Sequence, residues 1–125
     1  MSVETVMLES KKWAVVGATD DQDKFGYKIY KKLKDNNYTV YPISVKCKEI
    51  DGDKAYKELA DLPEKVDVVD FVVNPRIGIS IIKQCKDLGI NNVWLQPGTV
   101  SEEILQYAKD NDIEAVQACV LVALS

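Results

Sequence analysis

The stretch that decides the fold is WAVVGATDDQDKFG, from Trp13 to Gly26. Its apolar run, Ala14 to Val16, ends at Gly17. A polar loop then leads to Lys24 and Gly26, where a helical pattern of apolar residues begins. A strand, a glycine turn and a helix N-terminus in this order are typical of α/β proteins that hold a phosphate group with backbone N–H groups and the helix dipole. We therefore interpret the stretch as the first βα unit of a parallel sheet and as a candidate phosphate loop.

The rest of the chain alternates apolar runs with segments of helical periodicity. Strands that alternate with helices of about ten residues imply βαβ units with right-handed crossovers. We predict a single domain over residues 1–125, with its core at about 13–119, folded as a Rossmann-like three-layer α/β sandwich around a five-stranded, mainly parallel sheet. The expected strands are 13–16, 39–42, 66–73, 92–95 and 113–116, and the expected helices are 24–36, 54–59, 75–87 and 102–110, with an apolar tail at 119–124.

Composition excludes several classes of function. The chain has a net charge of −4, and an acidic chain without a basic tract is a poor partner for nucleic acid. It contains no histidine, which rules out imidazole as a catalytic base or metal ligand. Cys47, Cys85 and Cys119 form no C-x-x-C pair, so we expect neither a metal site nor a disulfide framework. Without a bilayer-spanning apolar run or a signal-peptide core, we expect a cytoplasmic protein with no membrane partner.

The candidate site lies in the loops that follow the strands. Ligands of open parallel sheets bind beyond the carboxyl ends of the strands, near the point where the strand order reverses. We identify no catalytic acid, base or nucleophile in these loops, but four of them are small or polar and converge on one edge. They are Gly17-Ala18-Thr19, Pro42-Ile43-Ser44, Val73-Asn74-Pro75 and Gln96-Pro97-Gly98, with Cys119 after the last strand.

The loop after the second strand discriminates among nucleotides. NAD-binding domains place Asp or Glu about twenty residues beyond the glycine motif, where the acid binds the adenine ribose. The corresponding stretch here, residues 40–48, has no acid and contains Lys46 and Lys48. The dinucleotide motif G-x-G-x-x-G is also broken, because Ala18 and Thr19 follow Gly17. NAD is therefore disfavoured, and the two lysines either are solvated or meet a ribose phosphate, as in NADP or coenzyme A.

Five motifs in a fixed order make the chain resemble a known family. They are GAT-x6-G after the first strand, VYPI after the second, and then DGDKAYKELADLP, VDVVDFVVNP and NVWLQPG. This order is similar to that of small CoA-binding proteins, which are single Rossmann-like domains similar to the CoA-binding domain of the succinyl-CoA synthetase alpha subunit. The resemblance covers residues 13–119, nearly the whole chain.

The resemblance implies a site for coenzyme A or an acyl-CoA thioester. Backbone N–H groups of residues 17–19 would meet the CoA diphosphate, beside the charge of Lys24. Residues 42 and 43 would line the adenine and ribose, residues 72, 73 and 75 would pack on the adenine or the pantetheine arm, and residues 96 and 98 would flank that arm. The candidate cofactor-binding set is Gly17, Ala18, Thr19, Lys24, Gly26, Pro42, Ile43, Ser44, Lys46, Val72, Val73, Pro75, Gln96, Gly98 and Cys119.

Three functions remain open at this point. In the first, the chain binds CoA or acyl-CoA without catalysis of its own, as a homodimer or as the partner of an acyl-CoA enzyme. In the second, it is an interaction domain with a vestigial cleft. The latter is favoured by Asp20, Asp21 and Asp23 beside the proposed phosphate site, and by Ile43-Ser44-Val45 where the family commonly has V-N-P. An NADP-binding oxidoreductase fragment is the third reading, disfavoured by the missing glycine and the lack of a separate substrate domain.

Overall fold

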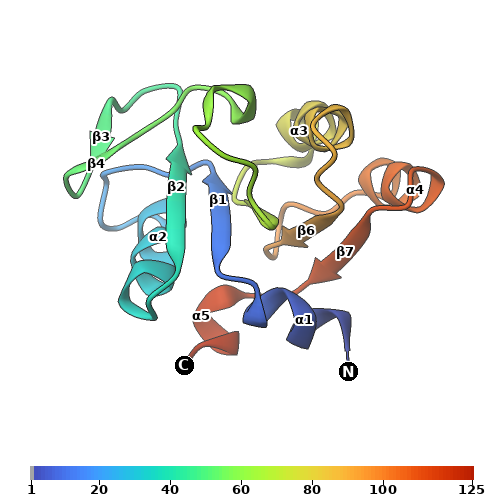
Figure 1. The fold of residues 1–125 in the computed structure, drawn as a ribbon, viewed down its shortest axis with the longest axis horizontal. Coiled ribbons are helices and arrows are strands. Elements are labelled where there is room, and N and C mark those ends of the chain that lie inside the picture. Colours follow the sequence, from blue (N-terminus) through green and yellow to red (C-terminus); the bar gives the residue numbers. More distant parts are fainter. Residues whose placement is uncertain (1) are drawn as a thin grey trace.

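A parallel β-sheet forms the centre of the fold (Figure 1). The structure is a computed structural model that describes residues 2–125. The sheet has five strands in the order β2-β1-β5-β6-β7, and every neighbouring pair is parallel, which confirms the predicted Rossmann-like α/β fold. Its strands are β1 (Lys12–Val16), β2 (Thr39–Ile43), β5 (Val68–Phe71), β6 (Asn92–Leu95) and β7 (Glu114–Gln117), and a separate antiparallel ribbon consists of β3 (Glu49–Ile50) and β4 (Asp53–Lys54).

Helices cover both faces of the sheet, which gives three layers (Figure 1). One face carries α3 and α4, and the other carries α1, α2 and α5. None of the helices between residues 2 and 125 combines the length and the hydropathy that a bilayer-spanning segment needs. The helices are α1 (Val3–Glu9), α2 (Phe25–Asp35), α3 (Pro75–Asp87), α4 (Glu102–Asp110) and α5 (Val120–Ala123), with a short 3-10 helix η1 (Leu59–Asp61).

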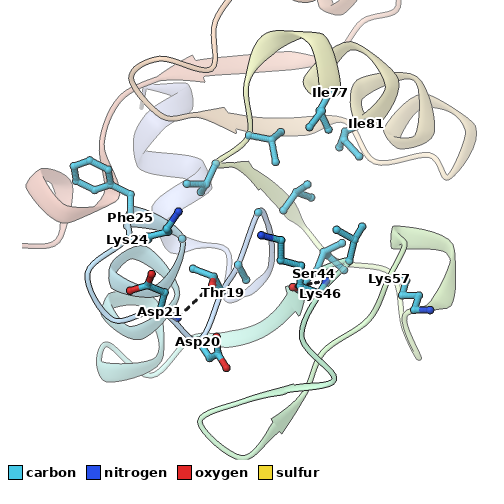
Figure 2. Close-up of a pocket in the computed structure, with 18 of the residues that line it drawn as sticks. Thr19, Asp20, Asp21, Lys24, Phe25, Ser44, Lys46, Lys57, Ile77 and Ile81 are labelled. Carbon is cyan, nitrogen blue, oxygen red and sulfur yellow. Dashed lines mark hydrogen bonds between the residues drawn. The ribbon is translucent and has the colours of Figure 1, made fainter.

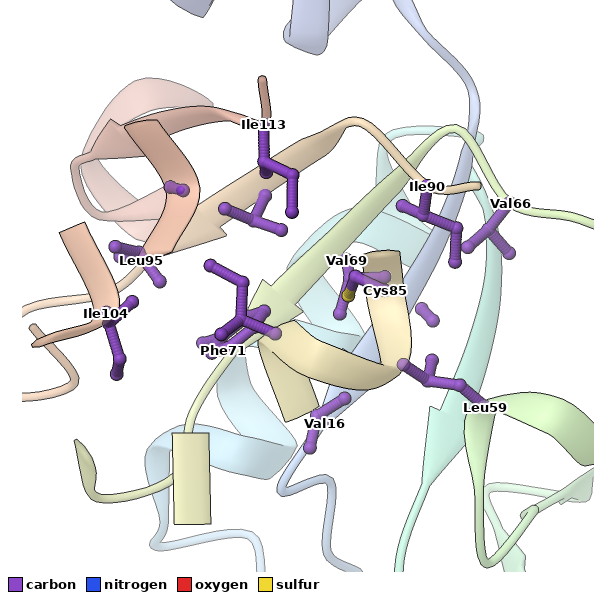
Figure 3. Close-up of a cluster of buried hydrophobic side chains, with 14 of the residues drawn as sticks. Val16, Leu59, Val66, Val69, Phe71, Cys85, Ile90, Leu95, Ile104 and Ile113 are labelled. Atoms are coloured by element: carbon purple, nitrogen blue, oxygen red, sulfur yellow. The ribbon is translucent and has the colours of Figure 1, made fainter. Parts of the chain in front are cut away.

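The alternation of side chains along β1 divides the core into two clusters. Ala14 and Val16 pack with the cluster that α3 and α4 cover, whereas Trp13 and Val15 pack with the cluster under α1, α2 and α5. Figure 3 shows the first cluster, in which Phe71 of β5 lies among side chains of the neighbouring strands and helices. The sheet is thus buried on both faces, as parallel sheets require.

Residues 54–59 do not form the predicted helix. This segment contains β4 at its start and reaches η1 at its end. Between them, the Tyr56 N–H donates to the carbonyl of Pro42 at 2.9 Å, and the Tyr56 carbonyl accepts from the Ser44 N–H at 2.8 Å. Because pairing with the end of β2 satisfies these backbone groups, tertiary contacts override the local helical pattern.

Two helices lie outside the predicted elements. Helix α1 begins after Ser2, whose hydroxyl oxygen accepts from the Thr5 N–H at 3.1 Å, and its Met7 side chain is fully buried in the second cluster. Helix α5 occupies the segment expected only as an apolar tail, and Val120 is its buried residue. Both helices form because the sheet offers apolar surface that a single turn or two can cover.

The strand order reverses between β1 and β5. From β1 the chain moves outward to β2, and it then returns to β5 on the other side of β1. In open α/β sheets this reversal creates a crevice at the carboxyl ends of the strands. The loops that follow β1 and β5 flank that crevice, so the fold places the candidate phosphate loop beside it.

Candidate functional site

A cleft of about 950 Å³ opens at the carboxyl ends of β1, β2 and β5, beside the N-terminus of α2 (Figure 2). It lies at the reversal of strand order, where the sequence predicts the site. Most of the predicted cofactor-binding residues contribute to its wall. They are Gly17, Ala18, Thr19, Lys24, Gly26, Ile43, Ser44, Lys46, Val72 and Val73.

Two glycines let α2 approach the end of β1. Gly17 has a φ of +97°, and a Cβ at this position would overlap the carbonyl oxygen of Val72. A Cβ at Gly26 would overlap the carbonyl oxygen of Gly17 itself. Glycine is therefore required at both positions. The motif GAT-x6-G brings the first turn of α2 against the loop after β1, a packing role that the third glycine has in dinucleotide-binding folds.

The backbone amides of this loop are not all available to a ligand. Both Gly17 N–H and Ala18 N–H donate to the carbonyl of Ile43, each at 3.2 Å. These two bonds attach the loop to the end of β2. The two amides are therefore not free to donate to a diphosphate, and other amides would have to bind it. Within residues 2–125, the amides of Thr19, Phe25 and Gly26 have no internal acceptor and remain available to an anion.

Helix α2 lacks the side-chain cap that the other long helices have. Ser2, Asn74 and Ser101 each accept a hydrogen bond from the first turn of α1, α3 and α4. The corresponding residue of α2 is Lys24. Its side chain has no hydrogen-bond acceptor and therefore makes no capping bond. The first amides of α2 therefore face the cleft with a partial positive charge that no side-chain cap offsets, and an anion would be stabilised there.

The three aspartates of the loop include one with a structural role. The Asp21 N–H donates to the Thr19 hydroxyl oxygen at 3.2 Å, and the Asp21 carboxylate accepts from the Asp23 N–H at 3.1 Å. Asp20 and Asp21 are among the lining residues drawn in Figure 2, and Asp23 lines the cleft as well. Residues 2–125 contain no group of three Asp, Glu, Cys or His side chains arranged to hold a metal ion. The carboxylate of Asp21 thus helps to fold the loop.

Three lysines line the same cleft. Lys24 begins α2, Lys46 follows β2, and Lys57 follows β4 (Figure 2). The turn that carries Lys46 is shaped by buried Ser44, whose hydroxyl oxygen accepts from the amides of Lys46 at 3.3 Å and Cys47 at 3.1 Å. Ser44 is therefore engaged in holding the turn, and Lys46 is the residue of this turn that offers charge.

Five predicted site residues lie outside the cleft, and two of them are prolines. Pro42, in β2, lines a separate hollow of about 340 Å³ together with Tyr41 and Tyr56. Pro75 is the first residue of α3, directly after the capping Asn74. Proline suits this position because its missing N–H would be unpaired in any case. The structure gives both prolines a backbone role, and a direct ligand contact by either stays a prediction.

A second, smaller cavity adjoins the cleft. It has a volume of about 310 Å³ and contains Gln96, Gly98 and Cys119 from the predicted set. Val72 and Val73 line both cavities, so they form the boundary between the two. The predicted residues therefore fall into two adjoining parts: a cleft with the phosphate loop and the lysines, and a cavity at the end of β6.

The sequence analysis missed Asp70, which lies fully buried behind this second cavity. The Gln96 amide donates to its carboxyl oxygens at 2.8 and 3.1 Å, and the Gln96 carbonyl oxygen accepts from the Val120 N–H at 3.2 Å. Burial raises the pKa of Asp70 to about 8, although the bond from Gln96 opposes the rise. A charged residue inside the apolar run VDVVDFVV is the signal that could have identified it.

A family model described as a CoA binding domain matches residues 11–125. The chain belongs to this CoA-binding family. It is 36% identical over 81 residues to the alpha subunit of ADP-forming acetate–CoA ligase II from Pyrococcus furiosus, and 32% identical over 106 residues to ADP-forming acetate–CoA ligase from Methanocaldococcus jannaschii. These matches cover 64% and 85% of this chain but only 18% and 15% of the two relatives. The chain therefore corresponds to a small part of those enzymes.

Solved structures include both single-domain and multidomain neighbours. A hypothetical protein from Pyrococcus horikoshii superimposes with a TM-score of 0.90 at 29% identity, covering 95% of this chain and 84% of that chain. An acetyl-coenzyme A synthetase from Candidatus Korarchaeum cryptofilum, solved with phosphate and ADP, gives a TM-score of 0.74 at 25% identity and covers 86% of this chain and 26% of that one. The fold thus occurs both alone and as part of a synthetase.

Proposed function

We propose that this chain binds coenzyme A or an acyl-CoA thioester in the cleft between β1, β2 and β5, without catalysing a reaction alone. The observation that carries the proposal is the uncapped N-terminus of α2, which Gly26 and Gly17 bring into the crevice at the reversal of strand order. Membership of the CoA-binding family supports the choice of ligand.

The diphosphate belongs at the start of α2. The amides of Thr19, Phe25 and Gly26 are available there, and Lys24 adds a full positive charge at the same end of the helix. Amides at a helix N-terminus and a nearby ammonium are the groups that bind phosphate in α/β folds. These groups take the place of the Gly17 and Ala18 amides that the sequence analysis expected to bind the diphosphate, because those two amides donate to the Ile43 carbonyl instead.

The adenosine end belongs beside β2. Ile43 and Val72 provide apolar walls for a base, and Lys46 and Lys57 also line the cleft. A phosphate on the ribose would find these ammonium groups, whereas the two free hydroxyls of NAD would find no carboxylate in residues 40–48. This difference supports CoA over NAD.

A role as partner or carrier follows from the same residues. The chain has no histidine, so no imidazole is available to transfer a proton or to carry a phosphoryl group. The ligase relatives are proteins several times longer than this chain. We therefore infer that any chemistry on the thioester occurs with an acyl-CoA enzyme as partner.

Calorimetric titration with CoA, acetyl-CoA, NADP and NAD tests the proposal. We expect micromolar binding of CoA and acetyl-CoA, and weak or undetectable binding of NADP and NAD. Lys24→Ala should weaken CoA binding by roughly fivefold, because a solvated ion pair contributes up to about 1 kcal/mol.

Lys28→Ala provides the matched control. Lys28 is exposed one turn further along α2 and does not line the cleft, so this variant changes the net charge equally and should retain wild-type affinity. If both variants lose CoA affinity equally, the effect of Lys24 comes from the net charge of the protein and not from a contact in the cleft. A preference for NADP, or no binding of any of the four ligands, would contradict the proposal; the second result favours an interaction domain.

A further inference from the structure

The cavity at the end of β6 is separate from the phosphate cleft but shares a wall with it. Phe25, Val72 and Val73 line both spaces. A ligand held by its phosphates at the start of α2 can therefore extend past the two valines into the second cavity. Ile29 and Cys119 complete the apolar part of its lining.

Most polar side-chain groups of this cavity already have protein partners. Gln96 uses its amide on Asp70 and its carbonyl oxygen on the Val120 N–H. The Thr99 hydroxyl donates to the Gln96 backbone carbonyl at 2.7 Å, and the Asn74 carbonyl oxygen caps α3. Among the described residues that line the cavity, none is Lys or Arg. An occupant therefore finds mainly apolar contacts and no counter-charge.

We propose that this cavity receives a short, uncharged acyl group carried on CoA. The inference rests on the proposed function, because the cleft must hold the CoA phosphates before the thioester can reach the cavity. The pantetheine arm separates the thioester from the diphosphate of CoA, and Val72 and Val73 separate this cavity from the phosphate loop. Its volume of about 310 Å³ suits an acyl chain of a few carbons together with the end of the pantetheine arm.

A carboxylated acyl group does not fit this chemistry. Its carboxylate would lose water in a cavity without a cation, and Asp70 lies directly behind the Gln96 amide. Burying an unpaired charge is strongly unfavourable. The cavity should therefore discriminate between acyl groups of equal length that differ in charge.

Titration of the full chain with a series of acyl-CoA thioesters tests this inference. From acetyl-CoA through propionyl-CoA to butyryl-CoA, we expect the affinity to rise by up to about fourfold for each added methylene, as for burial of apolar surface. Succinyl-CoA, which has the same number of chain carbons as butyryl-CoA, should bind more weakly than acetyl-CoA. Equal affinities for CoA, acetyl-CoA and butyryl-CoA, or equal affinities for butyryl-CoA and succinyl-CoA, would overturn the inference.

Two substitutions of Cys119 locate the effect in this cavity. The quantity to compare is the ratio of butyryl-CoA to acetyl-CoA affinity within each variant, since any loss common to both ligands cancels. Cys119→Phe fills the cavity, so the ratio of the two affinities should fall to about one. Cys119→Ala leaves the cavity open, so the ratio should stay as in the wild type. A wild-type ratio in folded Cys119→Phe overturns the assignment. The wild-type series decides the inference even if that variant does not fold, and absence of CoA binding itself is the separate failure of the proposed function.

Discussion

Gly17→Ala is expected to destabilise the protein by roughly 2–5 kcal/mol, because it combines two costs. A left-handed backbone costs an alanine about 1–2 kcal/mol, and overpacking against a rigid neighbour costs about 1–3 kcal/mol more. Gly17 has a φ of +97°, and its added Cβ would overlap the carbonyl oxygen of Val72, which is backbone and cannot move aside. Chemical denaturation followed by circular dichroism measures the change in the free energy of unfolding.

Gly52→Ala is the matched control for this substitution. Gly52 also has a positive φ, of +85°, but a Cβ there would meet no heavy atom within 4 Å. The control should therefore lose only about 1–2 kcal/mol from the backbone. If the two variants lose equal stability, the close approach of the loop to β5 is not what requires glycine at position 17.

The stability of the protein should fall as the pH rises from 5 to 8. Asp70 has a pKa of about 8 in the folded state against an ordinary value of 3.8, so the folded state holds its proton more tightly than the unfolded state. The stability from this group is complete below about pH 4, decreases between pH 4 and 8, and is lost above the folded pKa. At about 1.4 kcal/mol per pH unit, the loss from pH 5 to pH 8 is roughly 3–4 kcal/mol.

Asp70→Asn tests the origin of this pH dependence. Asparagine keeps the shape of the protonated acid and can still accept from the Gln96 amide, but it does not ionise. The variant should show a nearly level free energy of unfolding from pH 5 to 8, and it should exceed the wild type in stability near pH 9. Asp87→Asn, at an exposed carboxylate, should retain the wild-type slope. If the free energy of unfolding of the wild type does not change with pH, or if the slope persists in Asp70→Asn, the buried carboxyl does not control the pH dependence of stability.

The sheet and its longer helices could be predicted from the sequence because each has a strong local pattern. The run Ala14 to Val16 ends at a glycine that the backbone requires, and the β5 run is apolar because both faces of the sheet are covered. Helix α3 carries Pro75 at its first position after the capping Asn74, which marks its start. In these elements local propensity and tertiary packing agree.

Other features depend on contacts that the sequence pattern does not contain. The segment around Tyr56 has helical spacing, yet its backbone pairs with the end of β2. The amides of Gly17 and Ala18 follow the glycine motif, yet Ile43 accepts both of them, so the available donors move to Thr19 and the start of α2. Only the spatial neighbourhood of β1 and β2 determines these hydrogen bonds.

The site itself was predicted as one group of loops, and the structure divides it. Val72 and Val73 separate the cleft beside the phosphate loop from the cavity that contains Gln96 and Cys119. No spacing in the sequence indicates this boundary, because the two valines directly follow β5 and act only through their position between α2 and β6.

An NMR titration of the isotope-labelled chain with CoA locates the ligand by residue. If CoA binds as proposed, the largest saturable amide shifts occur at Thr19, Phe25 and Gly26, with smaller shifts around Lys46 and Val73. The amides of Gly17 and Ala18 should shift less than that of Thr19, since both already donate to Ile43. Saturable shifts confined to residues outside the cleft, or no shifts at millimolar CoA, would contradict a CoA site at the start of α2.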